Sequence, residues 1–185
     1  MSKEEKKRPD PDLPLDVSRL LLRVGDIMFV QNHPKKRAEK EYYCPIVDIG
    51  EEEHRLIATR LVKWYKEDEL DDRLCVVVVN IRELAVHGIE SEGILLCAQD
   101  DKFGFELVSP PSDSQPGDLI MVPGYKYHEG STGITYDDFN LIAEDLGVNS
   151  EKQVVYMGIP LEVPGKGYVT TQFSKDCPIR SPIEK

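Results

Sequence analysis

The chain has 185 residues, enough for one domain with a sizeable core or for a small barrel with a packed extension. It carries 34 acidic and 23 basic residues, a net charge of −11, which argues against a general nucleic-acid binder because phosphate affinity comes mainly from lysine and arginine. No apolar run approaches the ~20 residues of a membrane span, and the charged N-terminus lacks an apolar signal segment. Residues 1–63 have a net charge of +1 and residues 64–185 one of −12, so a polyanion should approach the first third of the chain.

Residues 1–14, MSKEEKKRPDPDLP, are charged and interrupted by proline, a composition typical of a disordered leader or linker. The basic cluster at 6–8 could contact RNA, but four nearby acidic residues offset its charge. We therefore expect a solubilising tail.

The first strand is predicted over residues 20–30, where apolar residues alternate. Gly25 interrupts this strand and suggests a bulge or a bend at a barrel corner. The loop 33–41, HPKKRAEKE, follows and is the densest basic patch of the folded region. Charged loops are usually only solvated, and a nucleic-acid contact is the alternative interpretation.

Two further strands are predicted over 42–50 and 55–61, followed by a short helix over 66–70 that caps the barrel end. Trp64 and Tyr65 precede this helix and could stack on bases. Packing under the helix is the commoner use of such a pair, and we favour it.

The runs 74–79 and 94–98 are dense in apolar, β-branched residues and predict two buried strands. The polar bend between them holds Gly88, Ser91 and Gly93. We expect the two strands to form the floor of a small barrel. A further strand over 103–108 should close the barrel.

The remaining chain predicts an extension that begins near residue 118 with a strand over 119–122. Thr135 is a plausible N-cap for a helix that runs to Leu146, with Gly147 as its C-cap signal. Short strands are predicted after this helix. They cover residues 154–156, 160–163 and 168–170.

The cysteines at positions 44, 75, 97 and 177 show no metal-ligand spacing. Cys75 and Cys97 lie in apolar runs, where a reduced thiol behaves as a small hydrophobic side chain. Unpaired cysteines of this kind are typical of a reducing cytosol, so we expect a cytoplasmic protein.

A series of short motifs occurs in one order between Asp16 and Pro182. They include Ser18-Arg19-Leu20, Leu22-Arg23-Val24-Gly25, His33-Pro34, Val47-Asp48-Ile49-Gly50-Glu51, Asn80-Ile81-Arg82, Gly88-Ile89, Ser91-Glu92-Gly93-Ile94, Pro116-Gly117-Asp118 and Val163-Pro164-Gly165-Lys166-Gly167. In these motifs the chain resembles the tRNA-binding domain family. That family includes the C-terminal module of the endothelial monocyte-activating polypeptide II precursor and domains appended to some tyrosyl- and methionyl-tRNA synthetases.

The resemblance implies a mainly β fold, a five-stranded OB-fold barrel followed by a packed extension with short strands and one helix. It places the OB-fold tRNA-binding domain at residues 15–111 and the extension at 112–185. Similar extensions imitate a dimer interface, so we expect a monomer.

The resemblance also implies a nucleic-acid site, because the loop between the first two strands of an OB-fold commonly borders the oligonucleotide face. The expected contacts are Lys35, Lys36, Arg37, Lys40, Thr59, Arg60, Asn80, Arg82, His87 and Ser91. The chain departs from the family at part of this face. A basic pair is replaced by Ala85 and His87, Glu92 stands where a glutamine is usual, and Glu83 and Glu90 add negative charge.

We find no catalytic constellation. The four histidines lie in separate loops without paired ligand spacing, and no phosphate-binding glycine loop occurs. We therefore expect no enzyme, no cofactor and no metal site in this chain, although it could be a domain of a synthetase or an accessory to one.

Three functions remain open. The first is a non-catalytic auxiliary tRNA-binding module of an aminoacyl-tRNA synthetase or a multisynthetase complex, with tRNA and a synthetase or scaffold protein as partners and no membrane. The second is a protein-assembly module with reduced RNA affinity. The third is a cytokine-like signal, whose segment in the family matches residues 22–28; Asp26 and Met28 alter it, so we rank this reading last.

Overall fold

The computed structural model describes residues 13–129 and 132–184, and within them the chain is mainly β. The leader predicted for residues 1–14 lies outside the described residues except for its last two. In chain order the elements are η1 (Val17–Arg19), β1 (Leu22–Phe29), β2 (Ile46–Asp48), β3 (Arg55–Leu56), α1 (Glu67–Leu70), β4 (Leu74–Val78), β5 (Ala85–Val86), β6 (Ile89–Glu90), β7 (Ile94–Leu95), β8 (Cys97–Asp100), β9 (Gly104–Leu107), α2 (Tyr136–Ala143), β10 (Leu146–Val148), β11 (Val154–Tyr156), β12 (Ile159–Pro160), β13 (Glu162–Val163), β14 (Gly167–Tyr168) and β15 (Cys177–Arg180). None of these helices is long and apolar enough to cross a membrane.

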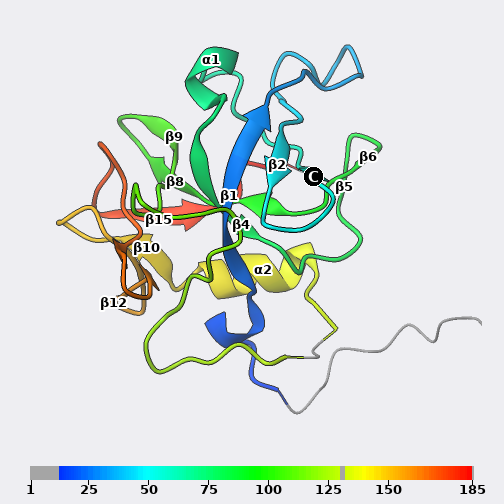
Figure 1. The fold of residues 1–185 in the computed structure, drawn as a ribbon. Helices are drawn as coiled ribbons and strands as arrows, with labels where there is room; N and C mark the ends of the chain where they lie inside the picture. The colour runs from blue at the N-terminus through cyan, green and yellow to red at the C-terminus, as the bar shows by residue number, and fades with distance from the viewer. Residues whose placement is uncertain (1–12, 130–131, 185) are drawn as a thin grey trace, which may run out of the picture.

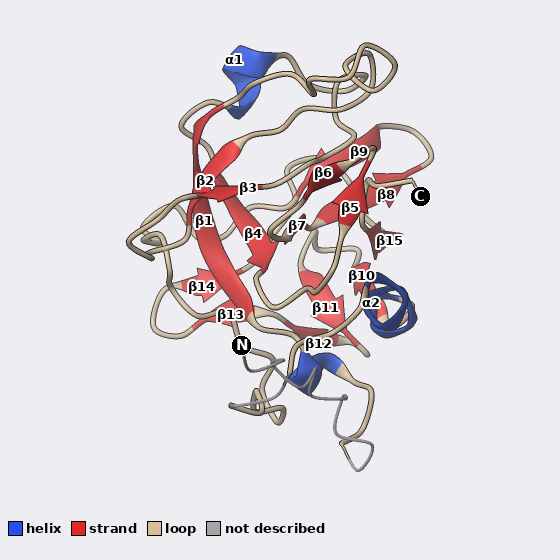
Figure 2. Cartoon of the chain, turned by 90° about the vertical axis from the view of Figure 1, so that its right-hand side faces the viewer, coloured by secondary structure: helices blue, strands red, loops and turns tan. Residues whose placement is uncertain are grey.

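Two sheets make up most of the described fold. Five strands form a curled sheet in the order β3-β2-β1-β4-β7 (Figure 1). Six strands form the second sheet in the order β12-β11-β10-β15-β8-β9. Figure 2 shows the molecule from the side, with α2 next to β10. The predicted fold class is a mainly β chain with a five-stranded OB-fold barrel followed by a packed extension with short strands and one helix. It is confirmed, with the five strands forming a curled half-barrel sheet.

The strand β1 lies at the centre of the curled sheet and pairs antiparallel with both β2 and β4. A side chain at Gly25 would bring its Cβ within 2.7 Å of Val47 and 2.9 Å of Val77, so glycine is what lets the neighbouring strands close in. The irregularity in the β1–β2 register comes later, between Ile27 and Phe29.

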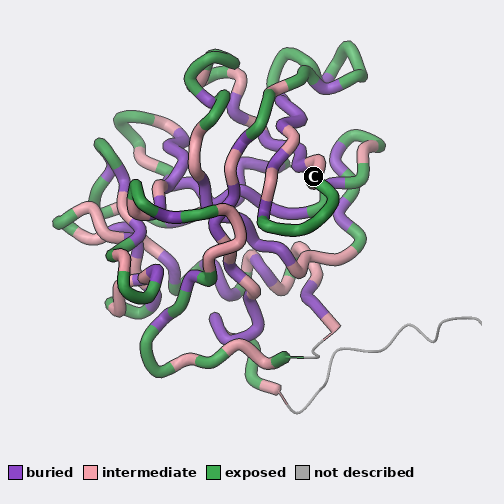
Figure 3. The backbone as a smooth tube through the Cα atoms, viewed as in Figure 1, coloured by how far each residue is buried: buried purple, intermediate pink, exposed green. Residues whose placement is uncertain are grey.

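The hydrophobic core lies on both sides of this strand. Leu22 and Val24 pack in a cluster that also contains Phe139 and Ile142 of the extension, whereas Ile27 packs in a cluster of barrel residues. Figure 3 shows the buried chain running through the centre of the molecule. Barrel and extension therefore share the first of these apolar clusters.

The strand β15 joins the two halves of the chain. It pairs with β8 of the barrel on one side and with β10 of the extension on the other. The residues after it are also fixed to distant parts of the fold. The Tyr42 hydroxyl accepts a hydrogen bond from the Glu184 N–H (2.9 Å), and the Tyr136 hydroxyl donates one to the Ile183 carbonyl (2.7 Å).

A buried carboxylate makes the second link between barrel and extension. Glu106 of β9 accepts hydrogen bonds from the backbone N–H groups of Gln172, Phe173 and Ser174, and from the Ser174 hydroxyl. Three backbone donors and one hydroxyl thus fix the loop before β15 to the barrel.

Several predicted boundaries change in the structure. The helix predicted to reach Leu146 ends at Ala143, and both Leu146 and Gly147 lie in β10, so Gly147 is not the C-cap. The strand predicted over 119–122 makes only isolated bridges, from Leu119 to Arg23, from Met121 to Glu162 and from Val122 to Tyr125. The strand expected to close the barrel, β9, pairs with β8 in the second sheet.

The aromatic pair before α1 was predicted to pack under that helix, and both side chains contact β9. The Tyr65 hydroxyl accepts from the Leu107 N–H (2.9 Å), and the Trp64 ring meets the Phe105 ring edge-on with centroids 5.0 Å apart. The cysteines also behave as predicted for thiols in an apolar interior. Burial raises the pKa of Cys44 to about 11 and that of Cys75 to about 12, so both stay uncharged at neutral pH.

A cluster of like charge lies on the curled sheet. Asp26 pairs across the β1–β2 ladder with Asp48, and its Oδ1 is buried without a hydrogen-bond partner. Burial, then the charges of Asp72 and Asp48, raise the pKa of Asp26 above its ordinary value. The folded protein therefore holds this proton more tightly than the unfolded chain does.

Asp26 should favour folding at low pH and oppose it as the pH rises through its folded pKa. We expect Asp26→Asn to raise the free energy of unfolding at pH 7 by a few tenths to about 1 kcal/mol, because it removes a like charge opposite Asp48. The gain should shrink as the pH falls toward 4. Urea unfolding at both pH values measures it, with the exposed Asp113→Asn as control. A gain that is equal at both pH values contradicts this account.

The Glu106 link can be tested in the same way. Glu106→Gln keeps the shape but turns an amide toward backbone N–H groups, so we expect the free energy of unfolding to fall by roughly 1.5–3 kcal/mol. The matched control is Glu151→Gln at an exposed position. Equal stability of the two variants would show that the carboxylate charge does not fix the loop.

Candidate nucleic-acid interface

The basic loop, residues 33–41, is anchored by the side chain of His33, which is only 1% exposed. Its Nδ1 accepts a hydrogen bond from the Lys35 N–H (3.1 Å), and its Nε2 lies 3.0 Å from the Val86 carbonyl oxygen. Because Nδ1 accepts, the ring proton belongs on Nε2, which donates to Val86. This single side chain fixes the loop to β5.

The basic loop folds back on itself and turns its cations outward. The N–H groups of Ala38 and Glu39 donate to the Lys35 carbonyl (2.9 Å each), and the Tyr42 N–H donates to Ala38 (2.8 Å). Ala38 is buried inside this turn. All four predicted contacts of the loop are exposed, namely Lys35, Lys36, Arg37 and Lys40.

The hairpin β5–β6 lies directly beside the basic loop. Its two-residue turn is His87-Gly88, with φ of 48° and 82°, the positive values that a type I′ hairpin requires. A side chain at Gly88 would place its Cβ 2.5 Å from the Lys35 ammonium nitrogen. His87 also meets the Tyr42 ring edge-on, with centroids 5.0 Å apart. The structure therefore brings His87 to the basic loop.

Arg60 lies at the edge of this surface, whereas Thr59 points inward and is buried. The Arg60 guanidinium forms an ion pair with Glu184 (3.2 Å) and lies 5.8 Å from the Trp64 ring centroid. Lys63 approaches the same ring, 5.4 Å from its centroid. Sequence reasoning missed Lys63, because only the fold brings its segment beside the basic loop, through a bond from the Val62 N–H to the Glu41 carbonyl (3.3 Å).

Two predicted contacts are used inside the fold. The Asn80 side chain donates to the Arg19 carbonyl (2.8 Å) and accepts from the Leu21 N–H (2.9 Å). The hydroxyl of Ser91 accepts from the Ala58 N–H (3.0 Å) and donates to the Gly93 carbonyl (2.9 Å). Both side chains stabilise turns of the barrel. The remaining predicted contact, Arg82, is half-buried and packs its aliphatic part against residue 133.

A polar cavity of about 270 Å³ opens next to Ser91 and is strongly acidic. Arg55 lines it but is already engaged, in an ion pair with Glu51 (2.8 Å) and in hydrogen bonds to the carbonyls of Val79 (2.7 Å) and Glu92 (2.9 Å). The glutamates that line it are Glu51, Glu53, Glu83, Glu90 and Glu92. Such a cavity repels phosphate. The barrel therefore has a cationic surface at the basic loop and a separate acidic surface at this cavity.

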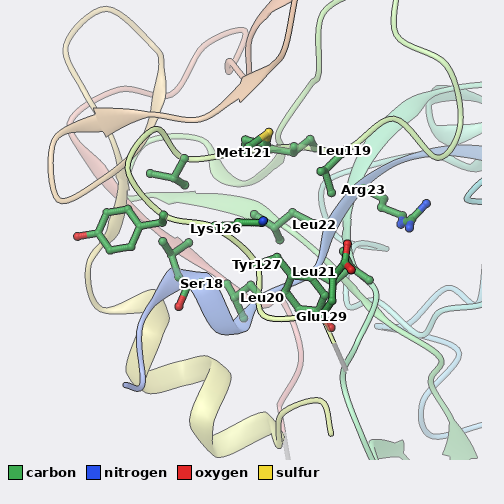
Figure 4. A pocket seen from close by; sticks show the side chains of 14 residues that line it. Ser18, Leu20, Leu21, Leu22, Arg23, Leu119, Met121, Lys126, Tyr127 and Glu129 are labelled. Carbon is green, nitrogen blue, oxygen red and sulfur yellow. The ribbon is translucent and has the colours of Figure 1, made fainter. Parts of the chain in front are cut away.

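An apolar cavity of about 420 Å³ lies elsewhere, between the start of β1 and the segment 119–127 (Figure 4). Leucines 20–22 face Leu119 and Met121 across it, with Lys126 at its rim. Its lining is mainly apolar, and its charged residues are Arg23, Lys126 and Glu129. Across residues 13–129 and 132–184 no cluster of histidine, cysteine and carboxylate side chains could hold a metal ion.

Comparisons with known proteins agree on one family. Residues 22–119 match the sequence model of the family described as "Putative tRNA binding domain". The chain is 33% identical over 160 residues to aminoacyl tRNA synthase complex-interacting multifunctional protein 1 of Cricetulus griseus, covering 86% of this chain and 44% of that protein. It is 38% identical over 117 residues to the cytoplasmic tyrosine–tRNA ligase of Xenopus tropicalis, covering 62% of this chain and 22% of that enzyme.

Among solved structures, the C-terminal domain of Plasmodium vivax p43 has the same fold, with a TM-score of 0.80 and 24% sequence identity. The match covers 90% of this chain and all of that domain. The chain spans less than half the length of the hamster and frog relatives.

The position of Ser91 predicts a structural role for its hydroxyl. We expect Ser91→Ala to lower the free energy of unfolding by roughly 1–3 kcal/mol, because it leaves the buried Ala58 N–H and Gly93 carbonyl without a partner. Chemical denaturation measures the loss, with the exposed Ser112→Ala as control. A variant as stable as the control would mean that the hydroxyl is free for other contacts.

Proposed function

Because this chain belongs to the tRNA-binding domain family, we propose that it is a non-catalytic module that binds tRNA on behalf of an aminoacyl-tRNA synthetase or a complex of synthetases. Two of the relatives are a tyrosine–tRNA ligase and a protein named for its interaction with a synthase complex, which supports these partners. Such a module holds tRNA by its backbone and shape and raises its concentration near a catalytic partner.

The exposed basic loop carries this proposal. Four cations stand on a turn that the buried His33 fixes to the barrel, so little conformational entropy is lost when phosphate binds. His87 and Lys63 extend the same surface on either side. Arg60 can exchange its exposed partner Glu184 for a phosphate, because a surface ion pair of this kind is weak.

The acidic cavity sets the limit of the interface. Its five glutamates would repel the tRNA backbone. The nucleic acid should therefore approach over the basic loop and not over the acidic cavity. We propose residues 15–111 as the tRNA-binding domain and 112–185 as the extension that keeps the chain monomeric. We also propose that the module is cytoplasmic.

The acidic cavity also favours one alternative, a module that docks on a synthetase or scaffold protein and has little RNA affinity of its own. Carboxylates in a cavity suit a basic protein surface better than a phosphate backbone. The cytokine-like alternative would have to act through β1. That strand is paired with β2 on one edge and with β4 on the other. A receptor could therefore contact the backbone of segment 22–28 only after the sheet opens.

The basic loop can be tested with a matched pair of charge reversals. Lys36→Glu and Lys126→Glu change the net charge equally, and both lysines are exposed. We expect Lys36→Glu to weaken tRNA binding several-fold at about 0.1 M salt, because it removes an attraction and adds a repulsion, while Lys126→Glu has little effect. A filter-binding titration measures both.

The triple variant Lys35→Glu, Lys36→Glu and Arg37→Glu tests the salt dependence. The slope of log affinity against log salt should fall by roughly one unit or slightly less for each phosphate group that the variant no longer binds. Wild-type slope and affinity in this variant would place the tRNA elsewhere. A wild-type chain that binds no tRNA would favour the assembly module.

A further inference from the structure

Two exposed phenylalanines lie together at the junction of barrel and extension. Phe103 is in the turn between β8 and β9, and Phe173 is in the loop before β15, on the side of the molecule away from β5–β6 in Figure 1. Their ring centroids are 5.8 Å apart with the planes at 36°, and the residues are 42% and 53% exposed. Adjoining exposed aromatic rings form a contiguous apolar patch, the kind of surface that binding sites use.

Both rings are presented by backbone that is held in place. The Asp100 carboxylate accepts hydrogen bonds from the N–H groups of Lys102 (2.7 Å) and Phe103 (3.3 Å). Glu106 accepts from the Phe173 N–H (3.1 Å) and from its neighbours on both sides. A ligand that stacks on these rings therefore does not first have to order their loops.

Cations gather around the rings. The hollow between the two segments, about 440 Å³, is lined by both rings, three lysines and two aspartates. The lysines are Lys102, Lys152 and Lys175. Residues 64–185 have a net charge of −12 and contain only seven lysines. Three of these seven lysines lie around this hollow, each from a separate segment of the chain. One of the two aspartates, Asp100, is already engaged by backbone N–H groups.

This surface adjoins the aromatic end of the proposed tRNA interface. The Trp64 indole occupies the space that a side chain at residue 104, next to Phe103, would need. Trp64 is in turn flanked by Lys63 and Arg60. Aromatic and cationic side chains thus continue from the basic loop to Phe173, while the glutamates line a different part of the barrel.

We propose that Phe103, Phe173 and the three lysines form a stacking platform for unpaired nucleotides of RNA. A base stacks on the exposed ring faces, and the lysine ammonium groups contact the adjoining phosphates, the combination by which proteins hold single strands without reading sequence. The choice of RNA as ligand rests on the proposed function. The platform adds to it a contact for a single-stranded part of the molecule.

The test uses a fluorescein-labelled, unstructured twelve-nucleotide RNA, with binding followed by anisotropy at about 50 mM salt. The variant Phe103→Leu with Phe173→Leu keeps apolar volume and removes the ring faces. We expect it to weaken binding roughly tenfold, since each stacked base is worth about five-fold or more. Met157→Ala with Leu141→Ala is the control, because it removes apolar side chains of the extension that are 64% and 54% exposed. It should bind as the wild type does.

A local readout accompanies the affinities. Ultraviolet cross-linking should attach the RNA to peptides that contain Phe103 or Phe173, and Lys102→Gln with Lys175→Gln should lower the salt slope. Wild-type affinity in the double leucine variant, or cross-links confined to other peptides, would overturn the platform and leave these rings to a partner protein.

The outcomes also separate this inference from the proposed function. If the short RNA fails to bind while tRNA binds and Lys36→Glu weakens it, the platform is wrong and the tRNA module stands. If the short RNA binds through the two phenylalanines but Lys36→Glu leaves the tRNA affinity unchanged, the platform stands and the proposed interface is wrong.

Discussion

Antiparallel pairing of β15 with β8 is the contact on which the arrangement of this molecule depends. Because β15 also pairs with β10, it draws β8 and β9 of the barrel into one sheet with the extension. That sheet places Glu106 under the loop before β15, and it delivers the residues after β15 to Tyr42 and Arg60. Other backbone contacts between the two halves include isolated bridges, such as those from Arg23 to Leu119 and from Ser109 to Thr170.

The second constraint is electrostatic. An acidic chain can approach a polyanion only if its cations are separated from its carboxylates. The fold separates them by placing the cations on the basic loop and many of the glutamates around the acidic cavity. His33 secures the cationic surface through one ring nitrogen to Val86 and the other to Lys35. The glutamates that line the cavity beside Ser91 restrict the directions from which a phosphate backbone can approach.

Features with a local cause could be predicted from the sequence, and features with a distant cause could not. A few consecutive residues were enough to predict three features: the alternation of β1, the cap at Thr135 and the cations of the basic loop. The strand β15 has Pro178 within it, which argues against a strand, and its partner β8 lies far away in the chain. Asn80 and Ser91 were predicted as nucleic-acid contacts because the family resemblance places them on the RNA face, but the backbone groups that engage them become neighbours only in the fold.

The interior position of β15 also has a consequence for biosynthesis. A ribosome delivers the barrel strands first, so the edge of β8 stays open until residues 177–180 emerge from the exit tunnel. During that interval a newly made chain exposes unpaired backbone groups and the apolar residues that the extension later covers. The speed of translation through the segment that encodes the extension, and the chaperones that meet the nascent chain there, should therefore govern how much of this fold reaches its native state.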